Sequence, residues 1–157
     1  MSSDLWHFAE QLYSQPGVET ACLELQEHGA DVCLLLCGAW LGVNGVECSA
    51  ERAAQLRAMS QPWQEQVVRC LRGVRQDWRA RAFDDPQLKA LREQVKQLEL
   101  QAERIQLERL AGLATQWPRS DQPSVGLWLT SLSAPLADSG RAAQNLLCDS
   151  ATALARL

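Results

Sequence analysis

The sequence predicts an all-α protein, a single-domain bundle of six to seven helices that includes a long helical hairpin. Apolar residues recur at three- and four-residue intervals along most of the 157-residue chain. Capping residues, glycines and prolines separate these periodic segments. The apolar fraction of 46% and the charged fraction of 22% are ordinary for a globular domain of this length.

The first three expected helices form the buried centre of the bundle. The first ends before Pro16-Gly17, which removes a backbone donor and permits a positive φ. The second spans about residues 18–27. The third, residues 32–41, reads VCLLLCGAWL and is apolar on every side, as expected of a helix surrounded by others. Asp31 precedes it and is the expected N-cap.

The next three expected helices include two long antiparallel partners. A fourth helix over about residues 47–59 is broken at Ser60-Gln61-Pro62, a fifth runs from Pro62 to about Arg81, and a sixth runs from Pro86 to about Trp117. The fifth is expected to bury one apolar face and the sixth to carry a short heptad seam. These positions are Val67, Leu71, Val74 and Trp78, and Leu88, Leu91, Val95, Leu98, Ala102 and Ile105. The seam makes helix 86–117 a candidate surface for homo-oligomerisation.

The chain divides into a helical bundle domain, residues 1–117, and a C-terminal segment, residues 118–157. Residues 118–124 are polar and contain prolines, which is typical of a linker. A last helix is expected from about Pro135, and the pattern leaves open whether it is docked on the bundle or mobile.

Charge is distributed unevenly along the chain. Residues 1–51 contain eight acids and no Lys or Arg, whereas residues 52–82 contain seven arginines against two acids. Arg69, Arg72, Arg75 and Arg79 form a stripe on the fifth expected helix, with Trp63 at its start. The stripe either pairs internally with Glu19, Glu24 and Glu27 or binds a partner with an acidic surface. A pI near 5.2 argues against a nucleic-acid binder.

No motif indicates a reaction. The chain has no GxSxG elbow, glycine-rich phosphate loop or HExxH sequence, and its only histidines are His7 and His28. Cys22, Cys33, Cys37 and His28 could ligate a metal, but without a CxxC knuckle they are interpreted as buried thiols and a helix end. We therefore predict no catalytic residue, cofactor or metal. Whether the protein is an enzyme stays open, with a non-enzymatic role favoured.

The segment around residues 5–42 resembles a known family. Its matching elements include Trp6, Leu12-Tyr13, Pro16-Gly17-Val18, Ala21-Cys22-Leu23, Leu25-Gln26, Gly29-x-Asp31-Val32 and Trp40-Leu41. They resemble a family of small proteobacterial proteins known only as a domain of unknown function, and the resemblance extends to about residue 115. It implies a helical bacterial cytoplasmic protein and carries no catalytic residues.

The sequence therefore favours a small protein-interaction or regulatory protein that uses a charged helical surface. Its expected partner is another bacterial protein with an acidic surface, bound by Trp63 and the arginine stripe. The alternative is a helical ligand-binding protein or enzyme acting on a small apolar or phosphorylated molecule, with Tyr13, Gln26 and Asp31 lining the pocket. The N-terminus lacks the basic region of a secretion signal, and the longest apolar run, 12 residues, is too short to span a membrane. These features predict a cytoplasmic location.

Overall fold

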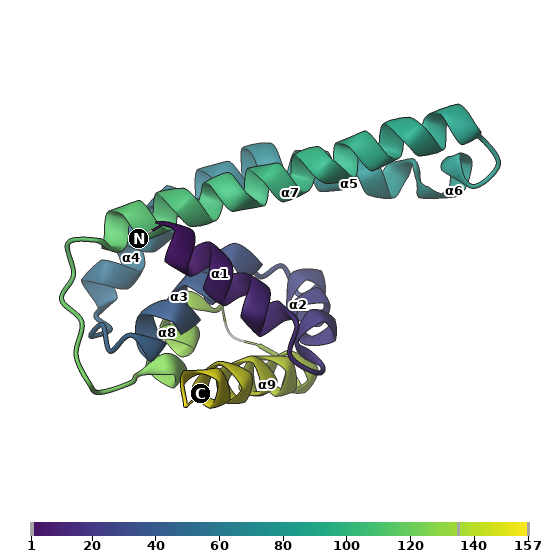
Figure 1. Cartoon of the computed structure of the whole chain (residues 1–157). Helices are drawn as coiled ribbons and strands as arrows, with labels where there is room; N and C mark the ends of the chain where they lie inside the picture. Colours follow the sequence, from purple (N-terminus) through teal and green to yellow (C-terminus); the bar gives the residue numbers. More distant parts are fainter. Residues whose placement is uncertain (1, 135, 157) are drawn as a thin grey trace.

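The computed structural model describes residues 2–134 and 136–156. In this part of the chain every regular element is a helix, which confirms the all-α, single-domain bundle with a long hairpin (Figure 1). The elements are α1 (Ser2–Tyr13), α2 (Val18–Glu27), α3 (Val32–Val43), α4 (Ala50–Trp63), the π-helical turn η1 (Gln64–Val68), α5 (Arg69–Asp77), α6 (Arg79–Ala82), α7 (Pro86–Ala114), α8 (Val125–Leu132) and α9 (Asp138–Ala155).

Helix α3 forms the centre of the core, as its apolar sequence predicts. The Asp31 side chain caps it by accepting a hydrogen bond from the Leu34 N–H at 3.1 Å. Its main neighbour is α8, and two glycines permit their close approach. A Cβ atom on Gly38 would lie 2.6 Å from the Leu132 side chain, and one on Gly42 would lie 2.5 Å from the Val125 backbone. Any side chain at Gly42 would therefore separate these helices.

The expected break at Ser60-Gln61-Pro62 is wrong. Helix α4 continues through Pro62 and leads directly into the π-helical turn η1 and then α5. Proline has no N–H to donate and crowds the preceding turn, and a π-helical turn is one way to absorb such a local defect without ending a helix. The α4–η1–α5–α6 rod packs antiparallel to α7, which ends at Ala114 instead of about Trp117.

The hairpin buries a different set of residues from the one predicted. Val68 is fully buried, whereas Val67, Leu71 and Trp78 are only half-buried and Val74 is exposed. The extra residue in the π-helical turn rotates the buried face. In α7, the only buried member of the predicted seam is Ala102. The second half of α7 packs on α1, α3 and α4, but its first half is covered on one side only, by the α5–α6 part of the hairpin, so the seam there stays at least partly open.

The C-terminal helices belong to the core of the body. Helix α8 packs on α3, and α9 packs on α2, α3 and α8. Trp128 in α8 is fully buried, and its Nε1–H donates to the Val46 carbonyl oxygen at 2.8 Å. The last helix begins at Asp138, while Pro135, where it was expected to start, lies outside the described residues. No helix in the described part of the chain combines the length and the hydropathy needed to cross a membrane.

Candidate functional site

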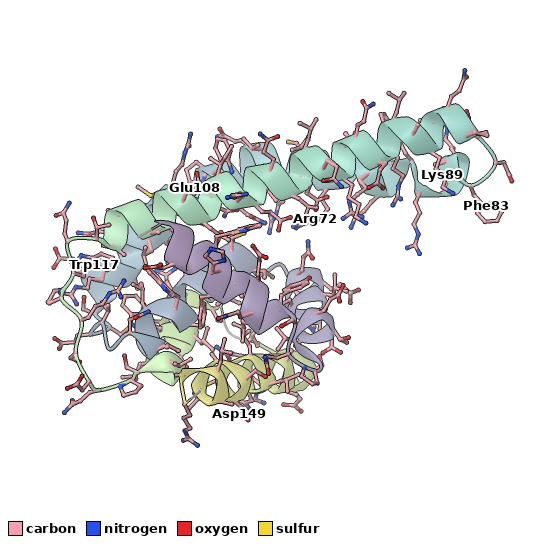
Figure 2. All side chains as sticks on the ribbon, viewed as in Figure 1. Arg72, Phe83, Lys89, Glu108, Trp117 and Asp149 are labelled. Carbon is pink, nitrogen blue, oxygen red and sulfur yellow. The ribbon has the colours of Figure 1, made fainter. Side chains whose placement is uncertain are left out.

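The far half of the hairpin projects from the helical body as an arm, defined here as residues 69–98 (Figure 1). All residues in this range are described, and only Ala82 among them is buried. Phe83, close to the tip, is 88% exposed, and Figure 2 shows it there near Lys89. The arm contains eight Lys or Arg residues against four Asp or Glu, a net charge of +4 in a chain of net −4. It is therefore the cationic part of an otherwise acidic protein.

One face of the arm's base carries a cluster of paired charges. The Glu99 carboxylate accepts from Arg75 Nε at 2.6 Å and from Arg72 Nε at 3.1 Å, which links α7 to α5. Figure 2 shows Arg72 on the side of the hairpin that faces α1 and α2. There the Arg72 guanidinium lies against the Gln26 side-chain amide, whose oxygen can accept from it once the amide is turned toward it. Arg72 and Arg75 thus pair inside the molecule, but with acids of α7 and not with the predicted Glu19, Glu24 and Glu27. Their partners are Glu99 and, for Arg72, also Glu103.

The other predicted partner-binding residues have separate surroundings. The Trp63 Nε1–H donates to the Ala102 carbonyl at 2.9 Å, and the Arg109 guanidinium lies 4.2 Å from the centre of its ring. Arg69 donates to the Gly29 carbonyl oxygen at 3.1 Å. Arg79 is exposed on the arm. The predicted stripe is thus split between contacts inside the molecule and the arm's surface.

The opposite face of the arm is apolar. Residues seven apart lie on one side of a helix, so Leu91, Leu98 and Ile105 follow one another along α7. Val74 is two residues from Arg72, so it lies on nearly the opposite side of α5. We call Val74, Leu91, Leu98 and Ile105 the outer stripe. Val74, Leu91 and Leu98 are 37%, 50% and 51% exposed.

Two of the three predicted pocket residues, Tyr13 and Gln26, line one groove. It has a volume of about 750 Å³ and lies between the body and the base of the arm. Its floor includes the buried Cys33, Leu36 and Leu107. The Arg72–Glu99–Arg75 cluster forms a wall, so the groove combines an apolar floor with a charged side.

Glu103 has the most perturbed carboxyl group in this groove. Burial raises its pKa to about 7, with the nearby charge of Glu99 adding to the rise and Arg72 opposing it. The closest guanidinium nitrogen of Arg72 is 3.9 Å away. Burial likewise raises the pKa of Tyr13 to about 12, so its hydroxyl keeps its proton near neutral pH. A carboxyl group that titrates near neutrality in a groove is a candidate proton donor or acceptor.

Replacing Glu103 with glutamine should stabilise the protein at alkaline pH and have little effect near pH 4. The folded-state pKa is about 7, above the ordinary value of 4.5, so the native state holds its proton more tightly than the unfolded state. Wild-type stability should therefore fall as pH rises from about 4.5 to about 7, by about 2 kcal/mol after allowance for partial exposure. Thermal denaturation from pH 4 to pH 8 measures this. Parallel pH curves for the two proteins would contradict the assignment.

The third predicted pocket residue, Asp31, lies elsewhere. Its carboxyl group accepts from the Ser60 hydroxyl at 2.6 Å and from Gln106 Nε2 at 3.1 Å, in addition to capping α3. Burial raises its pKa, and these hydrogen bonds oppose the rise. It lines a separate cavity of about 410 Å³, called here the inner cavity, where the end of α2 meets α4, η1 and α8. The structure therefore divides the predicted pocket between two sites.

The cysteines offer no thiolate at these sites. Burial raises the pKa of Cys22 to about 12 and raises the pKa values of Cys33 and Cys37 as well. No group of three or more His, Cys, Asp or Glu residues suited to a metal occurs in the described part of the chain. The chemistry available in the groove is proton exchange by Glu103 and hydrogen bonding.

Sequence reasoning missed Glu99 and Glu103, although the pattern of α7 contains a signal for the first. Glu99 lies four residues after Val95 and three before Ala102, which is the spacing of the inward face. A carboxylate at such a position requires a cation from the facing helix, and Arg72 and Arg75 supply two. Gln64, which lines the inner cavity, was also missed, because the sequence places it directly after the expected helix break.

These features define a class, a small all-α protein whose helical hairpin extends from a compact helical body. The chain belongs to the family described as protein of unknown function DUF2390, whose profile matches residues 4–110. This confirms the predicted resemblance to a family known only as a domain of unknown function. The match covers α1 to most of α7 and leaves α8 and α9 beyond it. No curated protein and no solved structure matches the chain.

Proposed function

We propose that this protein is a non-enzymatic interaction or regulatory protein whose arm binds an acidic amphipathic helix of another protein. The observation that carries the proposal is the outer stripe, which leaves Leu91 and Leu98 half-exposed on a two-helix arm. A third helix laid along the stripe would bury these side chains and complete a three-helix bundle. The proposed setting is the bacterial cytoplasm, in keeping with six cysteines that are all unpaired.

Charge decides between the candidate occupants of the stripe. The arm has a net charge of +4, so a second arm from another copy of this chain would bring like charges together. An acidic helix would instead be attracted by Arg79, Lys89 and their neighbours. This argument favours a different protein as the partner over homo-oligomerisation through helix 86–117.

The double substitution Leu91→Asp/Leu98→Asp is expected to abolish partner capture while the protein stays folded, because it puts two charges into the proposed interface. The matched control is Ala90→Asp/Gln97→Asp, which adds the same charges on the same helix, seven residues apart, at exposed positions about 100° round the helix from the two leucines. Tagged proteins would be used to capture partners from lysate of the source cells, with quantitative mass spectrometry as the measurement. The captured protein should contain an acidic amphipathic helix, and Arg79→Glu should weaken its retention.

Two results would overturn this proposal. One is equal capture of the same proteins by the wild type and by Leu91→Asp/Leu98→Asp. The other is a wild-type dimer in light scattering that the double substitution converts to a monomer, since the stripe would then be an interface between copies of this chain.

Ligand binding in the groove is the second candidate function. It is favoured by the convergence of Tyr13, Gln26 and Glu103 on one concave surface of ligand-binding size. A small molecule bound against Glu103 would change the pH at which that group titrates. The pH series proposed for Glu103→Gln, repeated with candidate apolar or phosphorylated molecules, therefore also tests this alternative.

A further inference from the structure

The inner cavity contains a polar side chain that makes no hydrogen bond to the described residues. Gln64 is only 5% exposed and lines the cavity, and its side-chain amide forms no hydrogen bond within these residues. The amide still reaches solvent, because the only fully buried side-chain polar atom without a partner in this part of the chain is Gln106 Oε1. Its donor and acceptor are therefore open to a ligand that enters the cavity.

The π-helical turn brings a second polar group to the same wall. The Arg69 N–H donates to the Gln64 carbonyl, five residues earlier, which is the hydrogen bond of a π-helix. Residues five apart in an α-helix are about 140° apart around the axis, whereas the wider π-helical turn brings them closer to the same side. Gln64 and Arg69 consequently both line the cavity. π-helical turns of this kind often occur at functional sites.

Two arginines border the cavity, and one of them, Arg69, lies close enough to Asp31 for its charge to lower the pKa of that carboxyl group. Arg69 donates to the Gly29 carbonyl, and Arg57 donates to the Ser131 carbonyl. Neither takes part in an ion pair within the described residues. The acids of the lining are Asp31, held by Ser60 and Gln106, and Glu65, which accepts from Gln61 Nε2 at 3.1 Å.

From this arrangement we infer that the inner cavity binds a small organic carboxylate. Its carboxylate would lie between the guanidinium groups of Arg57 and Arg69 and accept from the Gln64 amide. Its carbon body would pack on the apolar lining, which includes Leu34, Leu132 and Leu136. A single negative charge suits the site better than a doubly charged phosphate, because Asp31 and Glu65 lie in the same lining. The volume of about 410 Å³ is within the usual range for ligand pockets.

Hexanoate is the probe for this site, with hexanol as its neutral match and hexyl phosphate as its doubly charged match. In ¹⁵N-labelled protein, hexanoate should shift the side-chain amide signal of Gln64 and the backbone signals of Gly29 and Arg69 saturably. Hexanol and hexyl phosphate should bind more weakly. Gln64→Leu should weaken hexanoate binding about tenfold, followed through the backbone signals, because it removes a hydrogen bond to a charged group.

Two further variants keep the test decisive. Gln64→Leu should fold, since it removes no hydrogen bond within the described residues and the apolar side chain is of similar size. If it does not, Arg57→Met should show the same loss of binding. Gln76→Leu, on the exposed surface of the arm, should bind hexanoate like the wild type. The inference is overturned if hexanoate gives no saturable shift, if hexanol or hexyl phosphate binds at least as tightly, or if the folded variant binds hexanoate unchanged.

Discussion

Replacing Trp128 with alanine is expected to lower the free energy of unfolding by about 4 kcal/mol, the usual cost of removing a large aromatic side chain from a core. Trp128 is fully buried between α8 and the rest of the core, and its ring stacks on Trp117 with the centres 6.1 Å apart. The substitution also leaves the Val46 carbonyl without its donor. Chemical denaturation followed by circular dichroism measures the loss.

The neighbouring Leu127 provides the control, because it is on the same helix and 65% exposed. Leu127→Ala should change the unfolding free energy by about 0.5 kcal/mol or less. The comparison decides whether α8 and α9 unfold together with the family-matched part of the chain. If Trp128→Ala left the main unfolding transition unchanged, the C-terminal helices would be an appendage that unfolds independently.

Features that depend on local sequence were predictable. The helix α3 could be recognised from its continuous apolar sequence, its length and the cap at Asp31. The start of α7 at Pro86 was equally predictable, because an Asp directly before a Pro is typical of a helix N-terminus. In the structure the Asp85 carboxylate accepts from the Gln87 and Leu88 N–H groups, each at 3.2 Å. In each case residues within one or two helical turns determine the result.

Features that depend on distant partners were not predictable in the same way. The arginine stripe was visible as a helical pattern, but its partner Glu99 is 24 residues from Arg75 and depends on the register of the hairpin. Asp31 is only five residues from Gln26, but the chain turns between them at Gly29, where φ is +84°. As a result Gln26 lines the groove and Asp31 lines the inner cavity. Pro62 was misleading because its expected effect, a helix end, was replaced by the π-helical turn.

The heptad pattern of α7 overestimated burial for a related reason. A seam predicts which side chains share a face, but the number of helices packed on that face determines how far each is buried. In the arm only one helix faces α7, so Leu88 and Val95 are half-buried while Leu91 and Leu98 are exposed. The difference between predicted and observed burial is what identifies the outer stripe as a candidate interface.

Substituting Glu99 with glutamine is expected to cost about 3 kcal/mol, because it leaves the partly buried Arg75 with no carboxylate and Arg72 with only Glu103, 3.9 Å away. The side chains of Arg72, Arg75 and Glu99 are 14%, 24% and 7% exposed. Replacing all three with methionine should instead keep stability within about 1 kcal/mol of the wild type, since apolar packing often replaces a buried ion cluster at little cost.

The loss in Glu99→Gln should also be local at first. Because the cluster joins α5 to α7 at the base of the arm, amide hydrogen exchange should accelerate across residues 69–98 before it changes in α3. The arm would then be less ordered, and partner capture should weaken even though the outer stripe is untouched. The opposite result would be a loss of unfolding free energy below about 1 kcal/mol together with unchanged amide exchange in residues 69–98. It would show that solvent already screens the charges of the cluster and that helix packing alone holds the arm in place.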